Sequence, residues 1–388
     1  MSPRTRAVVM SLSAPVLAFA LVGGLLGKAM AREDTYQDLK VFDDVVSMIT
    51  NNYVEAVDID KVMSGAMRGL AEGLDPDSAY LSPGEVKQIE AHAELPAGSI
   101  GLDLTRQYYL RVIAARDGSP ADRAGLRTGD YVRAIDEKPT REMSVWEGMR
   151  ALRGAPGTTV TLTVLRGNAN EPHEVQLTRE VAPAADVSGR LAAPGVGYVR
   201  IAAITSNTAK QVEAQVTRLE KAGAAKLILD LRRTSGGDLD DGLALARLFV
   251  ATGTLAQRET KAGKEPIAAG AGGGAITAPA SVLVDVGTTG AAELFASALS
   301  GNDRAVLIGS HTMGRAAQQT LIKLPDGSGL WLSTIRYLTP DGEPLHEKGL
   351  EPGIAVAEPD PVDFGQPAPT ADPVLEKALE HAAMKQAA

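Results

Sequence analysis

The chain has 388 residues, no cysteine and a formal net charge of −9 at pH 7. The absence of cysteine excludes disulfides, thiol catalysis and cysteine-based metal sites, and the acidic balance argues against binding to nucleic acid. The length suggests two or three domains, and a hydrophobic fraction of 44% suffices for their cores.

An apolar segment opens the chain. Arg4 and Arg6 precede a mostly apolar stretch from Ala7 to Leu26, and Ala29-Met30-Ala31 is a small-residue pattern of the kind found at cleavage sites. This order is typical of an export signal, while a helix of about 20 residues, about 30 Å long, would also span a bilayer as an uncleaved anchor. Residues 1–31 are therefore predicted to be a signal peptide or signal anchor, with the rest of the chain outside the cytoplasmic membrane (periplasmic).

Residues 36–95 are predicted to form an N-terminal helical region. Apolar side chains recur at helical spacing from Tyr36 to Leu74 in two stripes, which predict an amphipathic pair of helices. Asp75-Pro76-Asp77 then indicates a turn. The stripes consist of Phe42, Val45, Val46, Ile49 and Tyr53, and of Val62, Met63, Met67 and Leu70.

The segment from Gly98 to about Val181 resembles a PDZ domain. The resemblance rests on the loop Ser99-Ile100-Gly101-Leu102 and on the later pattern G-S-P-A, A-G-L and G-D. It implies that backbone N–H groups of this loop receive a peptide carboxylate while the peptide adds a strand to the sheet edge. The alternative is a PDZ fold that only packs against its neighbour or acts as a lid. Strands are expected at Tyr131–Ile135, Thr159–Leu165 and Val175–Leu177.

Residues 195–358 alternate between strand and helix patterns, which predicts an α/β core. Ala182–Ala193 is expected to be a linker. The Gly/Ala-rich Ala262–Ala275 is expected to be a mobile loop, and it is not a phosphate loop because no G-K-[ST] follows it. Residues 359–388 combine a Pro-rich segment with a terminal helix over Val374–Met384. Core strands are expected at Val196–Ile201, Lys226–Leu231, Val282–Val286, Ala305–Ile308 and Leu330–Leu338, and core helices at Asn207–Ala222 and Ala291–Leu299.

The turn Gly287-Thr288-Thr289-Gly290 joins one of these strands to the helix that follows. Such a turn can expose a nucleophile while the helix N-terminus supplies amide donors for an oxyanion. Taken alone, the pattern favours an ordinary strand–turn–helix crossover.

From Val282 to Gln319 the chain resembles the catalytic segment of the C-terminal processing (tail-specific) peptidases, which are serine peptidases with a Ser-Lys dyad. The turn G-T-T-G-A-A-E parallels the family's G-S-A-S-A-S-E, and the segment G-L-D-P-D-S-A-Y-L is similar to its L-D-P-H-S-x-Y-L. The resemblance covers about residues 36–388. It implies an α/β core with an inserted PDZ domain and an N-terminal helical region that helps subunits associate. Later matches to the pattern are Arg304-Ala305, Gly309, Thr312, Gly314 and Gln319.

Two positions depart from the family's pattern. The nucleophilic serine falls on Gly290 and the lysine base falls on Arg315, while Gln319 is retained. Glycine has no nucleophilic atom, and arginine stays protonated and cannot accept a proton. The resemblance therefore implies an inactive member of the family, in which Gly236, Gly237 and Ala291 fall on the oxyanion-hole positions.

Three functions are compatible with these observations. The first is a pseudoprotease that binds peptide or protein C-termini, associates with itself or regulates an active relative. The second is an active serine-type or threonine-dependent peptidase with rearranged catalysis, using Thr288, Thr289 or Ser235. The third is a structural envelope scaffold.

Arg315 is also a candidate for binding a peptide carboxylate through two hydrogen bonds. His311 is the only histidine near the site, and a structural role is expected for it. No cofactor or metal is expected, because no pair of histidines has the spacing of metal ligands.

Overall fold

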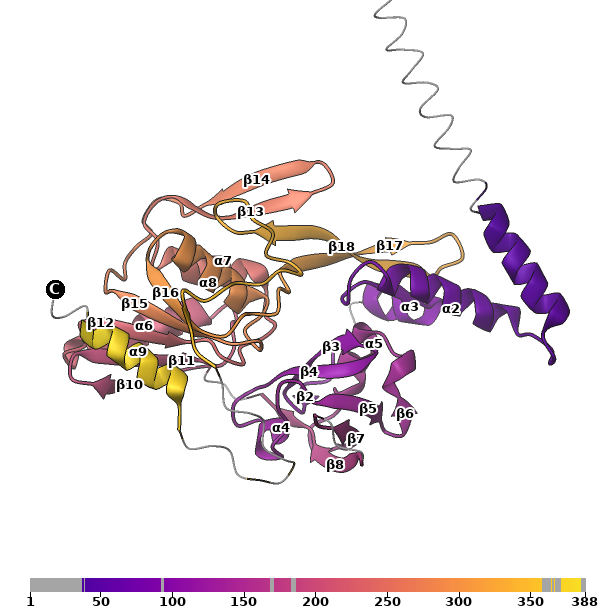
Figure 1. Cartoon of the computed structure of the whole chain (residues 1–388), viewed down its shortest axis with the longest axis horizontal. Helices are drawn as coiled ribbons and strands as arrows, with labels where there is room; N and C mark the ends of the chain where they lie inside the picture. The colour runs from indigo at the N-terminus through magenta and orange to yellow at the C-terminus, as the bar shows by residue number, and fades with distance from the viewer. Residues whose placement is uncertain are drawn as a thin grey trace, which may run out of the picture. The chain divides into compact units, whose positions relative to one another are not determined.

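The structure is a computed structural model, and it describes residues 37, 39–91, 94–167, 171–182, 186–357, 364, 366 and 371–384 (Figure 1). The predicted signal segment, residues 1–31, lies outside these ranges. Among the described residues, no helix combines the length and the apolar character needed to cross a membrane. The chain divides into two compact units, residues 1–69 and residues 70–388.

The first unit is helical, as the apolar periodicity predicts. A helix covers residues 39–52, and α2 spans Ile59–Glu72. The two helices are separated by residues 53–58, so the predicted pair is confirmed. Several apolar side chains of this region remain exposed, among them Leu39, Val41, Val45, Met48 and Tyr53.

The PDZ part of the second unit is an antiparallel sheet with the strand order β3-β4-β5-β7-β8, and β6 pairs with β5. Alternate residues of β7 are buried, which explains why this strand could be recognised from its sequence. β3 lies at one edge of the sheet, beside helix α5 (Val145–Ala151). The bounds are β3 Leu102–Gln107, β4 Tyr109–Ala115, β5 Tyr131–Ile135, β6 Lys138–Pro139, β7 Thr159–Leu165 and β8 His173–Thr178; α4 covers Pro120–Arg123, and β2 Gly98–Ser99 pairs with β9 Glu180–Val181.

The core is a six-stranded sheet with the order β10-β11-β12-β15-β16-β19, in which only β10 is antiparallel to its neighbour. Its central strands are apolar on both faces because helices cover both faces. Helices α6, α7 and α8 pack on one face and α9 on the other (Figure 1). The bounds are β10 Val187–Ala193, β11 Val196–Ile201, α6 Thr208–Lys221, β12 Lys226–Asp230, α7 Leu239–Arg247, β15 Ala280–Val284, α8 Ala291–Gly301, β16 Ala305–Gly309, β19 Ile354–Ala355 and α9 Pro373–Met384.

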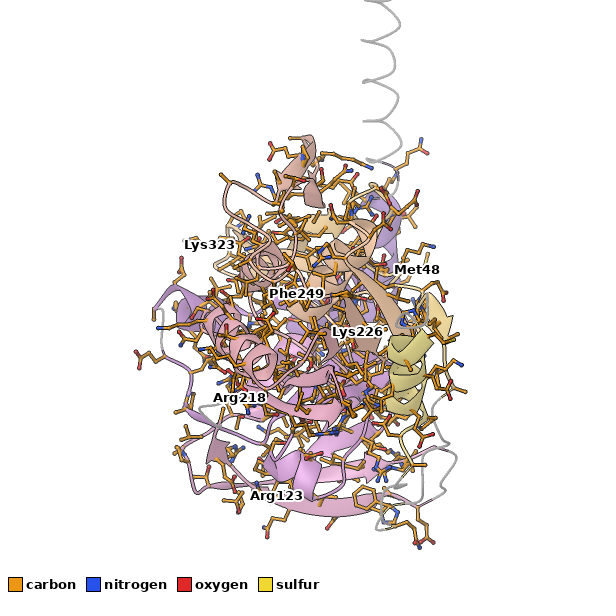
Figure 2. All side chains as sticks on the ribbon, turned by 90° about the vertical axis from the view of Figure 1, so that its left-hand side faces the viewer. Met48, Arg123, Arg218, Lys226, Phe249 and Lys323 are labelled. Atoms are coloured by element: carbon orange, nitrogen blue, oxygen red, sulfur yellow. The ribbon has the colours of Figure 1, made fainter. Side chains whose placement is uncertain are left out.

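Two aromatic rings meet on the helical face. Phe249, labelled in Figure 2, follows α7, and its ring centroid lies 5.6 Å from that of Phe295 in α8. Both side chains are fully buried. Aromatic pairs at this separation add to the stability that burial alone provides, so they help to hold α8, and with it the preceding turn, in place.

A second sheet has the order β1-β18-β13-β14, with β17 pairing with β18. It connects the segment before the PDZ part to the core, because β1 pairs with β18 in antiparallel register. Helix α3 (Pro83–Glu90) follows β1 and begins with a capping box at Ser82. The strands are β1 Ala79–Leu81, β13 Thr254–Thr260, β14 Gly263–Ala268, β17 Ala317–Lys323 and β18 Gly329–Leu338.

Two sequence predictions about loops are wrong. The expected linker Ala182–Ala193 contains β10, which adds an edge strand to the core sheet. The expected mobile loop Ala262–Ala275 contains β14, which pairs with β13. Both are edge strands whose side chains are mostly exposed or partly buried, so neither carries the buried apolar run that marks the central strands.

Candidate active site

The turn between β15 and α8 has the backbone conformation of a nucleophile elbow. Gly290, the residue before α8, has φ 62° and ψ −123°, which a residue with a side chain adopts only under strain. A Cβ built on Gly290 would lie 3.3 Å from the carbonyl oxygen of Gly236 and 3.8 Å from that of Arg315. A side chain here would therefore point between the two loops that carry those residues.

The buried carboxylate of Glu293 fixes the second of these loops. Glu293, in the first turn of α8, accepts hydrogen bonds from the amides of Gly314 and Arg315, both at 2.8 Å, and from the hydroxyl of Thr312. Burial raises the pKa of Glu293 to about 7, although these donors act in the opposite direction. The backbone of residue 315 is thereby held beside Gly290.

The side chain of Arg315 is engaged by groups of its own chain. Its Nε donates to Asp77 Oδ2 at 3.2 Å, its Nη2 pairs with the other oxygen of Asp77, and its Nη1 donates to the carbonyl of Leu104 at 3.1 Å. The side chain of Arg315 is 22% exposed and that of Asp77 is 9% exposed. Burial opposes the charge, but Asp77 raises the pKa of Arg315 above its ordinary value. Asp77 thus occupies the edge of the guanidinium at which a peptide carboxylate was expected.

Asp77 was not identified from the sequence as a site residue. The preceding Asp75 positions it, because Asp75 Oδ1 accepts hydrogen bonds from the amides of Asp77 and Ser78, both at 2.8 Å. One signal could have found it: Asp77 stands where the family's L-D-P-H-S pattern has histidine. This position and position 315 depart from the pattern together, and the structure shows that their side chains touch.

The oxyanion-hole positions lie beside Gly290. Gly236 and Gly237 both have positive φ, 70° and 83°, and a Cβ built on Gly237 would lie 3.5 Å from the Cβ of Ala291. Ala291 is the first residue of α8, and the first amides of a helix have no acceptor within the helix. The residues predicted to supply the donors therefore lie close to one another at the start of α8.

Gly236 and Gly237 line a cleft of about 180 Å³. Gly290, Arg315 and Gln319 all border it, and so does Asp77. The side-chain amide of Gln319 donates to Ser333 Oγ at 3.1 Å. The sequence thus predicted which positions meet at this cleft, although it did not predict their partners.

The hydroxyl groups near the cleft differ in how they are held. Thr288 is buried, and its hydroxyl contacts the carbonyl of Leu231 at 2.9 Å and Asp285 Oδ1 at 3.0 Å. Ser235 donates from its hydroxyl to Asp103 Oδ2. Thr289 borders the cleft and is 2% exposed. Thr288 is therefore committed to the turn, while Thr289 borders this cleft and Ser235 borders a second, larger one.

The predicted carboxylate loop, Ser99, Ile100, Gly101 and Leu102, borders a second, larger cleft of about 350 Å³. Gly101 has φ 72°, and a Cβ built on it would lie 2.3 Å from the Cβ of Ser119, so only glycine fits. The carbonyls of Ile100 and Gly101 accept hydrogen bonds from the amides of Ala121 and Arg116, at 3.0 and 2.8 Å. The loop is thus fixed through its carbonyl groups.

The two clefts share part of their lining. Asp103, Met149, Gly236 and Gly237 border both of them. The larger cleft runs along the start of β3 and the end of α5, and the smaller one reaches Gly290. A peptide whose C-terminus lay at the PDZ loop would therefore extend toward the elbow.

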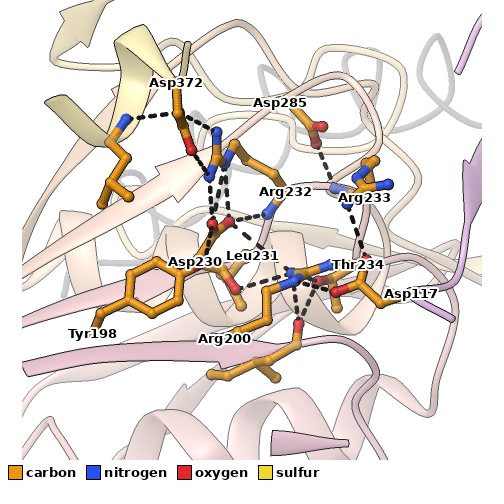
Figure 3. A network of polar contacts seen from close by, with 12 residues as sticks. Asp117, Tyr198, Arg200, Asp230, Leu231, Arg232, Arg233, Thr234, Asp285 and Asp372 are labelled. Atoms are coloured by element: carbon orange, nitrogen blue, oxygen red, sulfur yellow. Dashed lines mark hydrogen bonds and ion pairs between the residues drawn. The ribbon is translucent and has the colours of Figure 1, made fainter. Parts of the chain in front are cut away.

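A polar network joins the PDZ part to the core beneath the elbow (Figure 3). Arg200 of β11 donates to Asp117 Oδ2 at 2.7 Å and to Thr234 Oγ1 at 3.0 Å, and Arg233 Nη2 lies 3.0 Å from Asp117 Oδ1. Burial alone would raise the pKa of Asp117, but Arg200 and Arg233 hold it below its ordinary value. The carboxylate is therefore ionised and binds both arginines.

The same network anchors the end of β12. Tyr198 donates to Asp230 Oδ2 at 2.7 Å, and Arg232 bridges from Asp230 to Asp372, before α9, at 2.8 Å (Figure 3). The amide of Arg233 donates to Asp285 Oδ1 at 2.9 Å. The loop with Gly236 and the turn with Gly290 are thus tied to each other as well as to the PDZ part.

His311 lies outside both clefts and forms an exposed pair with Glu351, with 3.5 Å between Nε2 and Oε1. Among the described residues, no group of three or more histidine, aspartate or glutamate side chains is arranged to hold a metal ion.

Comparison with known proteins agrees with this architecture. The model of peptidase family S41 matches residues 195–356, and that of the PDZ domain matches residues 111–166. A carboxyl-terminal-processing protease of Synechocystis sp. is 32% identical over 313 residues, which are 79% of this chain and 73% of the relative. The carboxy-terminal processing protease CtpA of Bacillus subtilis is 30% identical over 315 residues, covering 80% of this chain and 67% of the relative.

A solved structure shows the same arrangement. The photosystem II D1 C-terminal processing protease is similar to this chain with a TM-score of 0.68 and 27% identity, over 79% of this chain and 84% of that protein. The sequence similarity extends through the PDZ part and the core together. The chain therefore belongs to the C-terminal processing proteases of peptidase family S41.

Proposed function

We propose that this protein is a pseudoprotease that binds the C-termini of peptides or proteins without cleaving them. One observation carries the proposal: at the elbow, Gly290 offers no side chain, and Arg315 is held as a cation by Asp77. A Ser-Lys dyad needs a hydroxyl and an amine that can take its proton. Neither group is present at these two positions, whereas the backbone around them keeps the geometry that catalysis would need.

The PDZ part supports binding of a free C-terminus. In the loop Ser99–Leu102, no residue larger than glycine fits at position 101. The loop leads into β3, whose outer edge pairs with no strand of the described residues. Amides in such a loop bind a terminal carboxylate, and an edge strand accepts an extended peptide as a further strand. Because Asp103 and Gly237 border both clefts, a peptide bound at the loop would extend toward the elbow.

The place of action we propose is outside the cytoplasmic membrane, since the first 31 residues have the pattern of an export signal. There the protein would bind chain ends of envelope or secreted proteins. Self-association, or association with an active relative whose substrates it holds, is part of the same proposal.

Binding and cleavage can be tested on one sample. A fluorescent eight-residue peptide with an apolar last residue is titrated with the exported part of the chain, and the mixture is then analysed by mass spectrometry. We expect saturable binding, loss of most of the affinity when the C-terminus is amidated, and no hydrolysis. Affinity that ignores the free carboxylate, or no binding at all, would contradict the proposal.

A second candidate, a peptidase with rearranged catalysis, has one observation in its favour. Ser235 donates to the carboxylate of Asp103 at the junction of the two clefts, and a carboxylate is a possible though weak base. If the peptide is hydrolysed, Ser235→Ala and Thr289→Val variants identify the nucleophile, and this candidate replaces the first. An envelope scaffold remains if neither binding nor hydrolysis is found.

A further inference from the structure

The unpaired edge of the PDZ sheet presents backbone groups of β3 to the smaller cleft. Leu104 of β3 stands opposite Val112 of β4. Both backbone groups of Val112 face the other way, because its amide donates to Asp130 and its carbonyl accepts from Gly129. Residues opposite each other without mutual hydrogen bonds point their backbone groups outward, so the amide and carbonyl of Leu104 face the free edge.

Arg315 already donates a hydrogen bond to one of these groups, the carbonyl of Leu104. Its Nη1 lies 3.1 Å from the carbonyl oxygen of Leu104. Its Nε and Nη2 are held at the same time by Asp77, whose side chain is 9% exposed. Asp77 therefore holds the guanidinium on one side, and on its other side the guanidinium donates a hydrogen bond to the edge of β3.

A peptide bound at the PDZ loop needs the same carbonyl. With its carboxylate on the loop, the last residue of an antiparallel peptide lies beside Leu102. The register irregularity between β3 and β4 places the extra residue on β4, so the alternation along β3 is regular. Leu104 then faces the residue two positions before the peptide's last residue, whose amide would donate to the carbonyl that Arg315 occupies.

We propose that Arg315, held by Asp77, is a latch on the peptide-binding edge and limits how much of a C-terminus can bind. The last two residues of a ligand enter with the latch closed. A longer stretch pairs with β3 only when Arg315 leaves the carbonyl of Leu104. This rests on the proposed function, and it gives Arg315, at the base position, a role in selecting the ligand by length.

A second contact from the core lies at the neighbouring residue of β3. The hydroxyl of Ser235 donates to Asp103, and a Cβ built on Gly236 would lie 3.4 Å from the same carboxylate oxygen. Ser235 of the core loop and Arg315 thus contact two successive residues of β3, Asp103 and Leu104. Both contacts lie beyond Leu102, so neither blocks the carboxylate loop.

The test compares ligand length in three proteins: the parent, the double variant Asp77→Asn with Arg315→Met, and Asp122→Asn. The double variant removes the latch without leaving a buried carboxylate unpaired. Asp122→Asn is the matched control, since it weakens a different contact between the PDZ part and the core, the pair with Arg233 at 3.2 Å. The probes are an eight-residue peptide and an N-acetylated dipeptide with the same last two residues, each with a free or amidated C-terminus.

We expect the double variant to bind the octapeptide about tenfold more tightly than the parent does, which is the effect of freeing one charge-assisted hydrogen bond. The dipeptide should change by less than about twofold, measured by NMR titration, and the control should change neither affinity. Equal changes for both lengths, or no change, would overturn the latch while leaving carboxylate binding intact. Binding that is absent or insensitive to amidation in all three proteins would overturn the proposed function and the latch with it.

Discussion

Two glycine-bearing loops of the second unit invite comparison, because both place backbone amides at a cleft. In the PDZ loop, Gly101 has φ 72° and lies against Ser119. In the elbow, Gly290 has φ 62°, and a Cβ built on it would lie 3.3 Å from the carbonyl oxygen of Gly236, a contact that requires only a small shift of that loop. The first loop has no space for a side chain at its glycine, and its Gly101 amide donates to Ser99 Oγ at 3.3 Å, whereas the second loop carries no nucleophilic side chain at its glycine.

The comparison shows that the backbone of the elbow is held by contacts that do not involve the side chains at the catalytic positions. The elbow is held by Thr288, Asp285 and Glu293, whose hydrogen bonds go to the turn itself or to the neighbouring loops. None of these bonds needs a side chain at position 290. The catalytic positions can therefore change while the turn persists.

The largest expected effect comes from rebuilding the elbow. Gly290→Ser with Arg315→Lys supplies both groups of the dyad, but Asp77 would remain beside the new amine and keep it protonated. We expect this double variant to stay inactive on an unfolded protein substrate. Adding Asp77→His, the residue of the family's pattern, should raise cleavage by about a hundredfold or more, the usual worth of a working general base.

The control for this rebuilding is the triple variant with Ala instead of Ser at position 290, which should be silent. A double variant that cleaves as fast as the triple would show that Asp77 does not govern the charge at position 315. In that case, only the side chains at positions 290 and 315 would separate a binding protein from a protease.

The PDZ loop should be far less tolerant than the elbow. Gly101→Ala places a Cβ 2.3 Å from that of Ser119, so the loop must move, and we expect peptide affinity to fall about thirtyfold or more, the scale of a lost central contact. Gly118→Ala is the matched control, since Gly118 has φ 69° and its Cβ would meet nothing within 4 Å. Equal losses in the two variants, measured by fluorescence polarisation, would show that backbone strain and not the shape of the loop sets the affinity.

The sequence predicted the parts of the molecule that are periodic. β12 carries the continuous apolar run Leu227–Leu229 because both faces of the core sheet are covered, and β11 is apolar except at Gly197 and Arg200; the bounds of both strands agree with the prediction to within one residue. β10 and β14 were missed because edge strands need no such run; five of the six residues of β14 are exposed and Ile267 is partly buried. Local patterns therefore identify central strands better than edges.

The contacts at the site were beyond the reach of local patterns. Arg315 and Asp77 are 238 residues apart, and Ser235 and Asp103 are 132 residues apart. Nothing in the periodicity of either segment says that they meet. The positions Gly290, Arg315 and Gln319 were predicted together only because a family pattern spans them, and that pattern carries no information about partners that replace its own residues.

The smallest effect concerns Glu293, which holds the elbow and the loop together. Its pKa is raised from an ordinary value of about 4.5 to about 7, so the folded state binds this proton more tightly than the unfolded state does. The resulting stabilisation is complete below about pH 4.5 and is lost as the pH rises through 7. Glu293→Gln keeps one acceptor and cannot titrate, so the parent should lose about 2 kcal/mol relative to this variant between pH 5 and pH 8. Urea unfolding at both pH values measures the difference. If the two proteins respond to pH in parallel, the carboxylate is ionised throughout, and the hydrogen bonds from Gly314 and Arg315 outweigh the cost of its burial.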